Sequence, residues 1–153
     1  MAVNLTSKAQ LDLIVKGFKK VLEQEAVQNF LRRMLEKAPA LVLAWLATHL
    51  KDLKDRPAQT WARPNYHFGQ KKLRRRVNKL SASISTVYGD GDGPGRADLV
   101  AAVGQIETAL SVAQRLPLAK RVRANFRIDS ALDEMERALF ESTLPNLAGG
   151  HYE

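Results

Sequence analysis

A run of rings followed by cations is the part of the sequence whose residue types and spacing most directly suggest chemistry. Residues 61–80 read WARPNYHFGQKKLRRRVNKL, and between Pro57 and Val87 there are seven Lys or Arg and no Asp or Glu. Cations neutralise phosphates, and ring faces stack on bases of any sequence. The pattern predicts a surface that binds nucleic acid through its phosphate backbone.

The candidate contacts fall into three sets. One helix is expected to supply most of the phosphate contacts, from Lys71, Lys72, Arg74, Arg75, Arg76 and Lys79. The stacking candidates are Tyr66, His67 and Phe68. A second, smaller cationic group, expected to supplement the same face, comprises Lys120, Arg121, Arg123 and Arg127, and Lys16, Lys19 and Lys20 could extend it. Because phosphate contacts carry no sequence information, we expect sequence-independent binding of single-stranded or duplex nucleic acid.

His67 is the residue for which a catalytic role can be argued. A histidine beside cations that hold a phosphodiester could act as general acid or base in metal-independent RNA cleavage. The spacing from Arg63 to His67 distantly resembles the Arg-to-His motif of the small helical HEPN ribonucleases, which implies that activity. That family places more residues between the two, and Pro64 opposes placing both on one helical turn. We expect His67 to stack, to contact phosphate or simply to lie at the start of the helix, and the chain not to be an enzyme.

Other chemistry is poorly represented in the sequence. The chain has no cysteine, so disulfides and thiolate metal sites are excluded. Asp90 and Asp92 resemble the start of a calcium loop, but Ala101 stands where a bidentate Glu is needed. His49 falls in an apolar helical pattern and is expected to be a core or boundary residue. We therefore predict no metal and no cofactor.

The charge is unevenly distributed along the chain, whose net charge is +8. Residues 129–153 carry six acidic residues and one basic residue, opposite in sign to the basic segment. This acidic stretch could neutralise the basic segment within one molecule, or pair with it in a neighbour and cause self-association.

The expected role is a small non-catalytic subunit of a nucleoprotein complex, with other protein subunits as partners. In general character the chain is similar to the small helical subunits of CRISPR effector complexes. The alternative is an assembly subunit whose basic face docks an acidic protein partner. The N-terminus shows no secretory signal and the longest apolar run is too short to span a bilayer, so we expect a cytoplasmic location and no membrane partner.

The apolar spacing predicts an all-α, single-domain bundle of five or six helices over residues 1–145, followed by a tail at 146–153. Ser7 is expected to cap a first helix, and residues 8–37 form one helix or two, with a break near Glu25 favoured. A helix from Pro39 to about Lys54 is expected at the centre of the bundle. The basic helix covers 66–88, and a flexible glycine-rich loop, 89–95, leads to a helix that starts near Asp98. A short basic segment, 118–127, then precedes a separate acidic helix that is capped by Ser130 and runs to about Glu141.

Overall fold

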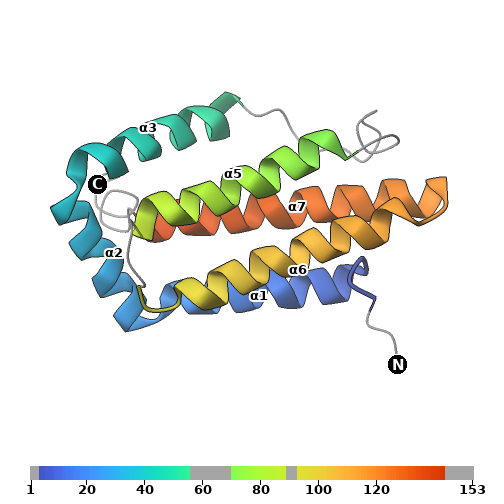
Figure 1. Ribbon diagram of the computed structural model, residues 1–153, viewed down its shortest axis with the longest axis horizontal. Helices are drawn as coiled ribbons and strands as arrows, with labels where there is room; N and C mark the ends of the chain where they lie inside the picture. Colours follow the sequence, from blue (N-terminus) through green and yellow to red (C-terminus); the bar gives the residue numbers. More distant parts are fainter. Residues whose placement is uncertain (1–3, 56–69, 89–92, 144–153) are drawn as a thin grey trace.

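The computed structural model describes residues 4–55, 70–88 and 93–143, without the side chains of 52–55 (Figure 1). These residues form helices and the short connections between them. The helices are α1 (Lys8–Glu23), α2 (Glu25–Lys37), α3 (Pro39–Asp55), α5 (Lys71–Tyr88), α6 (Arg96–Gln114) and α7 (Leu118–Thr143). No strand occurs among the described residues, and the predicted all-α bundle of five or six helices is confirmed.

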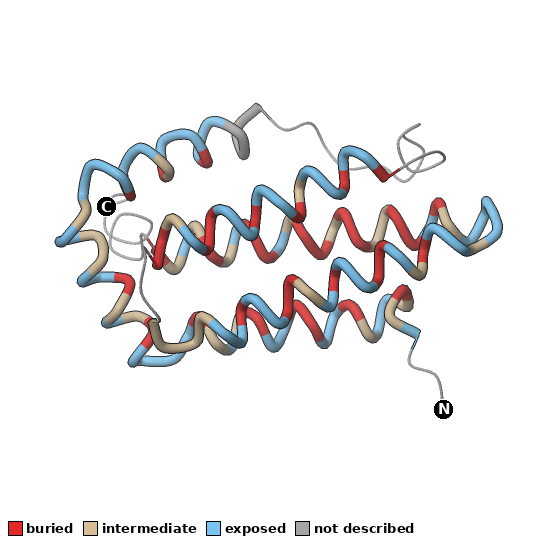
Figure 2. Tube along the Cα trace, in the orientation of Figure 1, coloured by how far each residue is buried: buried red, intermediate tan, exposed pale blue. Residues whose placement is uncertain are grey.

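Four of the helices, α1, α5, α6 and α7, pack side by side around a common core (Figure 1). The chain runs in one direction along α1, α5 and α7 and in the opposite direction along α6. Both α6 and α7 pack against α1 and against α5, so that α1 and α5 occupy opposite corners of the bundle. Figure 2 shows the buried residues along the inward faces of these four helices, which is how amphipathic helices remove apolar surface from water.

The first helix begins where the sequence predicts. The Ser7 side chain accepts a hydrogen bond from the backbone N–H of Gln10 at 3.2 Å, which satisfies a helix donor that would otherwise lack a partner. The helix ends because Gln24 takes an extended conformation with ψ 137°, and α2 then leaves at an angle (Figure 1). The favoured break near Glu25 is therefore confirmed.

The prediction that the helix from Pro39 lies at the centre of the bundle is wrong. The core is formed by α1, α5, α6 and α7 together with Val27 and Leu31 of α2, and α3 packs on the outside, against α2 and α5. It buries one face and leaves Leu41, Leu43 and Leu50 exposed by 54%, 49% and 56%. His49 lies on the buried face, as expected, with its ring centroid 5.4 Å from that of Trp45 and 5.1 Å from that of Phe140.

The glycine-rich connection is only partly described, and its described residues, 93–95, are closely packed. A Cβ on Gly93 would lie 2.7 Å from the Phe30 ring, and one on Gly95 would lie 2.6 Å from a Val21 methyl group. Gly95 also has a φ of 77°, a left-handed conformation that other residues rarely adopt. The expected flexibility therefore does not extend to these three residues. The next helix starts at Arg96, two residues before Asp98, with Gly95 as its N-cap.

The last helix corrects another prediction. Residues 118–143 form a single helix, so the expected boundary between a basic segment and an acidic helix capped by Ser130 does not exist. The buried positions keep one phase across Ser130, with Ile128, Leu132 and Met135 at helical spacing in the core. Packing against the bundle therefore outweighs the local preference of Ser130 for a helix start.

Candidate nucleic-acid interface

The exposed side of α5 carries the densest cluster of cations in the described part of the chain. Lys71 and Arg75 each lie two residues before a buried residue, Leu73 and Val77, and two residues correspond to about 200° of rotation around a helix. Both side chains therefore point away from the core. We call the exposed cations of this helix the α5 basic surface; they are Lys71, Lys72, Arg74, Arg75 and Lys79.

Three members of the α5 basic surface are uncompensated. Lys71, Lys72 and Arg75 form no ion pair or side-chain hydrogen bond with any described residue. Lys71 and Lys72 also lie in the first turn of α5, which contains no acidic residue. The N-terminus of a helix carries a partial positive charge, so cations there are unfavourable and anions are favourable. The local electrostatics therefore favour an anionic ligand at this end of α5.

Polar contacts hold the start of α5 between α6 and α7. The Gln70 side-chain amide donates to the backbone carbonyl of Leu110 at 2.8 Å and to the Asn125 side-chain oxygen at 3.0 Å. One turn later, the Arg74 guanidinium donates to the Gln114 side-chain oxygen at 3.3 Å. These bonds fix the N-terminal end of the α5 basic surface beside the connection between α6 and α7.

Additional cations lie at the same end of the bundle, where α6 ends and α7 begins (Figure 1). Lys120 and Arg123 from the second predicted group are exposed, whereas Arg121 and Arg127 are only partly exposed. Arg127 turns toward the N-terminal segment and donates to the backbone carbonyl of Thr6 at 3.5 Å. Arg115, which sequence reasoning missed, is exposed at the end of α6.

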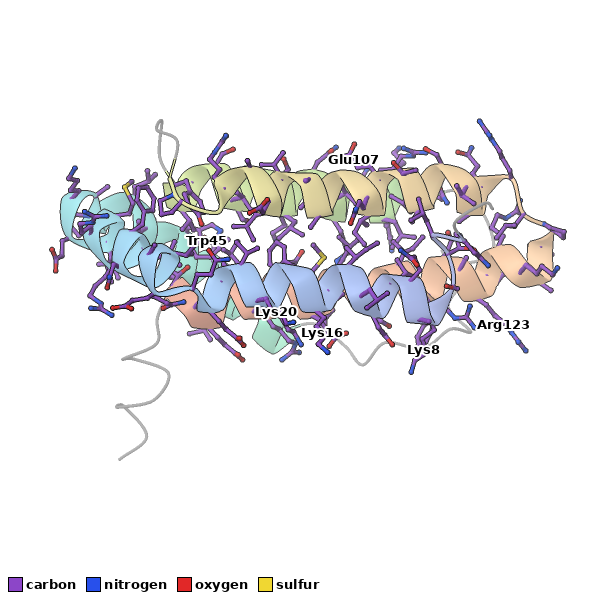
Figure 3. The ribbon with its side chains drawn as sticks, turned by 90° about the horizontal axis from the view of Figure 1, so that it is seen from below. Lys8, Lys16, Lys20, Trp45, Glu107 and Arg123 are labelled. Atoms are coloured by element: carbon purple, nitrogen blue, oxygen red, sulfur yellow. The ribbon has the colours of Figure 1, made fainter. Side chains whose placement is uncertain are left out.

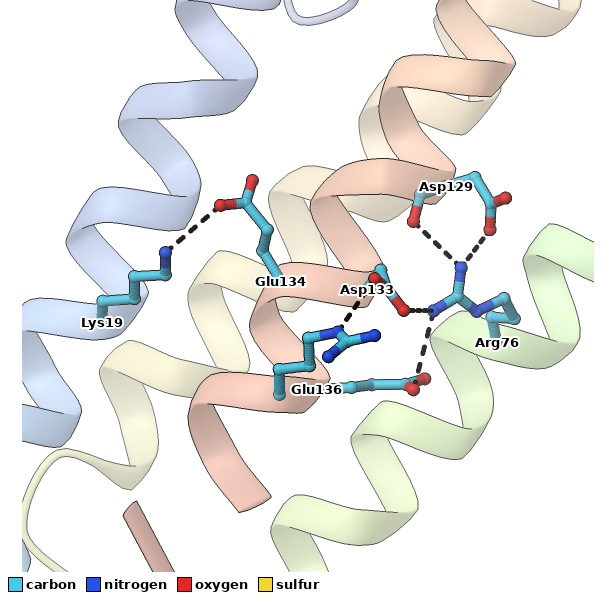
Figure 4. Close-up of polar contacts among 7 residues, drawn as sticks. Lys19, Arg76, Asp129, Asp133, Glu134 and Glu136 are labelled. Carbon is cyan, nitrogen blue, oxygen red and sulfur yellow. Dashed lines mark hydrogen bonds and ion pairs between the residues drawn. The ribbon is translucent and has the colours of Figure 1, made fainter. Parts of the chain in front are cut away.

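Arg76 was predicted to contact phosphate together with its neighbours, but the structure turns it toward α7. Its guanidinium forms an ion pair with the Asp129 carboxylate and donates to the Asp129 backbone carbonyl at 2.9 Å (Figure 4). Its Nη2 atom lies 3.7 Å from a carboxylate oxygen of Asp133 and 3.6 Å from one of Glu136. The Arg76 side chain is 17% exposed and that of Glu136 is 2% exposed. Arg76 therefore joins α5 to α7 inside the protein and does not belong to the α5 basic surface.

A sequence signal for this inward arginine does exist. Arg76 lies three residues after Leu73 and four before Leu80, which places it at the border of the apolar stripe of α5. On α7, Asp129 and Glu136 recur at the spacing of the buried apolar residues. The acidic segment thus neutralises part of the basic helix within the molecule, which was one of the two alternatives for its role.

The ring-bearing residues predicted to stack, Tyr66, His67 and Phe68, lie outside the described residues, as does Arg63. The stacking and ribonuclease interpretations therefore stay predictions. Within the described ranges, no cluster of His, Asp or Glu has an arrangement that could hold a metal ion. In that same part of the chain, no helix combines the length and apolar character that crossing a membrane requires.

The open groove of about 520 Å³ between α1, α2 and α7 lies away from the α5 basic surface. It is lined by both signs of charge, including Lys19 and Arg137 on one hand and Glu134 and Glu141 on the other. Lys19 and Glu134 pair across it at 3.2 Å. This mixed lining offers no single-sign field for a polyanion, so the groove is not the candidate interface.

Comparison of the chain with protein-family models, with curated proteins and with solved structures finds no match. The candidate interface therefore rests on the charge and geometry of the chain itself.

Proposed function

We propose that the protein binds the phosphate backbone of nucleic acid, without sequence preference, through the α5 basic surface. The observation that carries this proposal is the division of the cations of α5 into two kinds. Arg76 is surrounded by Asp129, Asp133 and Glu136, whereas Lys71, Lys72 and Arg75 face solvent with no carboxylate partner among the described residues. The carboxylates thus stabilise the fold and leave the outer cations available to an external anion.

The dimensions of the surface suit a polyanion. Lys71 and Lys79 are eight residues apart, which corresponds to about 12 Å along the helix axis. A duplex carries one phosphate charge per about 1.7 Å of its length, so several phosphates lie within that span. Lys and Arg contact phosphates without reading bases, and the binding is therefore independent of sequence. In this proposal the chain contributes binding and no catalysis, as a small subunit of a nucleoprotein complex.

The test is binding of the purified protein to labelled single-stranded RNA, single-stranded DNA and duplex DNA across a salt series. The informative variant is Lys71→Ala/Lys72→Ala/Arg75→Ala, which leaves the Arg76 network intact. If three phosphate contacts are lost, the slope of log affinity against log salt falls by about two to three units. Tyr66→Ala and Phe68→Ala should weaken single-strand binding alone if those rings stack.

A matched control separates a specific surface from net charge. Arg32, Arg33 and Lys37 are exposed on α2. Arg32 and Arg33 line a groove together with Glu36, so this part of α2 carries both signs of charge. Replacing all three cations with Ala removes the same charge as the α5 variant, and we expect binding to fall much less. Equal losses in the two triple variants would indicate non-specific attraction by the whole protein. An absence of binding at low salt would overturn the proposal and favour an acidic protein partner.

A further inference from the structure

The helices on either side of α5 bring further cations to its start. The Gln70 side chain, immediately before α5, contacts both Leu110 of α6 and Asn125 of α7. Three exposed cations stand near these contacts, at the end of α6 and in the first two turns of α7, and none of them pairs with a described residue. They are Arg115, Lys120 and Arg123.

Arg115 and Arg123 point to opposite sides of the bundle. Arg115 lies two residues after the buried Ala113, and Arg123 lies two residues before the buried Asn125, so each points away from the core. Because α1 and α5 occupy two opposite corners of the bundle, α6 and α7 occupy the other two. Figure 3 shows Arg123 directed away from α6. The two arginines therefore face outward in nearly opposite directions.

The α5 basic surface lies between these two arginines. Since α5 packs against α6 on one side and against α7 on the other, its outward cations face a direction between those of Arg115 and Arg123. The cations thus pass around the end of the bundle over the corners of α6, α5 and α7, which is about half of its circumference. With helix axes 8–10 Å apart and helix diameters of 10–12 Å, this path is about 35 Å long. We call it the basic arc; its members are Lys71, Lys72, Arg75, Arg115, Lys120 and Arg123.

The parts of the sequence that form the basic arc contain no acidic residue. There is no Asp or Glu in residues 56–88 or in residues 108–128. The nearest acidic residue on α6 is Glu107, about two turns before the end of the helix. The nearest on α7 is Asp129, whose carboxylate pairs with Arg76. The positive field of the arc is therefore not offset by carboxylates of the helices that carry it.

The fourth corner of the bundle, α1, differs in this respect. Lys16, Lys19 and Lys20, which the sequence predicted to extend the basic face of α5, lie on this helix, diagonally opposite α5 (Figure 3). The exposed Asp12 and Glu23 stand within about one helical turn of the first and last of these lysines. The charge along α1 therefore alternates in sign, and the basic arc ends before this corner.

We propose that the basic arc is one continuous binding site and that its ligand is single-stranded nucleic acid. This inference rests on the proposed function of the α5 basic surface and names the ligand class of that site. A duplex has a persistence length of about 50 nm, so one that lies on α5 cannot bend around the bundle to reach Arg115 and Arg123 together. A single strand can follow the arc, as strands do in the basic grooves of single-strand-binding proteins. With one phosphate per about 3.4 Å of stacked strand, the arc holds roughly ten nucleotides.

The experiment compares ligand classes and ligand lengths. Fluorescence anisotropy at low salt measures the affinity of the protein for mixed-sequence single strands of about 4 to 20 nucleotides, and for a duplex of about 20 base pairs. The test variant, Arg115→Ala/Arg123→Ala, removes both ends of the arc and keeps the α5 basic surface. The control, Arg32→Ala/Arg33→Ala on α2, removes the same charge from a region that also carries Glu36.

We expect the affinity of the wild-type protein for single strands to rise with length up to about ten nucleotides and then to level off. In the test variant, the affinity for strands of that length should fall at least fivefold. The slope of its log affinity against log salt should fall by about 1.4 units, because two phosphate contacts are lost. Binding of about four nucleotides, which fit on α5 alone, should change less than twofold. The α2 control should keep the length dependence of the wild-type protein.

The outcomes separate this inference from the proposed function. An unchanged length dependence in the test variant, equal losses in the test and control variants, or tighter binding of the duplex than of the single strand would overturn the arc. Each of these results leaves the α5 basic surface standing if Lys71→Ala/Lys72→Ala/Arg75→Ala still abolishes binding. If the wild-type protein binds neither ligand, the proposed function fails and the arc fails with it.

Discussion

Arg76 and Arg75 are neighbours in the sequence with different physical roles. Arg76 has carboxylates from three residues of α7 around its guanidinium, and its side chain is mostly buried. Removing one partner of a buried ion pair leaves the other charges desolvated without compensation, which costs far more than losing an exposed cation. The three adjacent arginines, Arg74 to Arg76, therefore cannot be treated as one functional unit.

Arg76→Ala should lower the free energy of unfolding by about 3–5 kcal/mol, because Asp129 and Glu136 would remain buried without their shared cation. Arg75→Ala, one position earlier and exposed, should change it by less than about 0.5 kcal/mol. Urea denaturation followed by circular dichroism measures both. A cost below about 1 kcal/mol for Arg76→Ala would show that the network contributes little to stability.

Tyr88 is the residue from which a pH dependence follows. Its ring is buried against Phe30, with centroids 5.1 Å apart, and its hydroxyl donates to the backbone carbonyl of Pro94 at 3.2 Å. Burial raises the pKa of Tyr88 from 10.0 to about 12, because the phenolate would lose its hydration. Between these two pH values the unfolded chain releases the proton and the folded chain keeps it, so unfolding becomes easier as the pH rises.

The free energy of unfolding should therefore fall between pH 10 and pH 12, by roughly 2 kcal/mol at most from this residue. Tyr88→Phe removes the titrating hydroxyl, so its stability should depend less on pH over the same range, although it loses the hydrogen bond to Pro94. Urea denaturation at a series of alkaline pH values makes the comparison. Identical pH profiles for the two proteins would refute the assignment to Tyr88.

At the level of elements, the connection into α6 depends on glycine. Gly95→Ala would require an alanine at a φ of 77°, with its Cβ 2.6 Å from Val21 near the end of α1 and 2.9 Å from the buried Val27 of α2. We expect a loss of stability of about 2 kcal/mol or more. Gly17→Ala in α1 is the matched control, because its Cβ meets nothing and alanine favours a helix by about 0.5–1 kcal/mol.

Thermal unfolding of both glycine variants distinguishes backbone geometry from a general sensitivity to glycine replacement. Gly95→Ala should melt at a lower temperature than the wild-type protein, and Gly17→Ala at the same temperature or a higher one. If Gly95→Ala were neutral, the left-handed conformation at residue 95 would not be required for α6 to dock.

How far the sequence predicts the elements depends on whether local or tertiary forces define their ends. The start of α1 follows from the Ser7 cap, which is a local signal. The apolar pattern itself shows no change near Glu25, and the break before α2 was favoured because a single helix of about 30 residues is uncommon. The capping pattern at Ser130 failed because the core contacts of α7 continue through it. The apolar residues of α3 predicted a central, buried helix. However, other helices already fill the core, so α3 packs outside it and buries only one side.

The sequence identifies the helix that carries the candidate interface, but not which individual cations belong to it. A run of Lys and Arg identifies the helix, and the period of the apolar stripe identifies which side faces solvent. Helical spacing alone does not show that Arg76 meets Asp129, which is 53 positions away. It also does not show that Lys16 on α1 lies on the opposite side of the bundle from Lys71 on α5. Both facts depend on the order in which the helices pack, which the sequence pattern leaves open.

At the scale of the whole molecule, most of the paired charges stabilise the fold, whereas the exposed cations of α5 are placed where they destabilise it. Asp129 of α7 pairs with Arg76, and Glu134 of α7 pairs with Lys19 of α1. In contrast, Lys71, Lys72 and Arg75 repel one another, and the two lysines lie in the first turn of α5, where the helix carries a partial positive charge. Like charges at neighbouring helical positions and cations at a helix N-terminus each cost a few tenths of a kcal/mol or more. The cations in the first turns of α5 therefore lower the stability of the fold.

The variant Lys71→Ala/Lys72→Ala/Arg75→Ala should therefore be more stable than the wild-type protein at low salt, by about 1 kcal/mol. Near 1 M salt the Debye length falls to about 3 Å, and the salt-dependent part of the difference should disappear. Urea denaturation at low and high salt measures this, and the α2 variant Arg32→Ala/Arg33→Ala/Lys37→Ala, whose Lys37 lies in the favourable last turn of its helix, should show no such gain. A less stable α5 variant at low salt would mean that these cations have partners in the folded protein, and their availability to a phosphate backbone would be lost with that result.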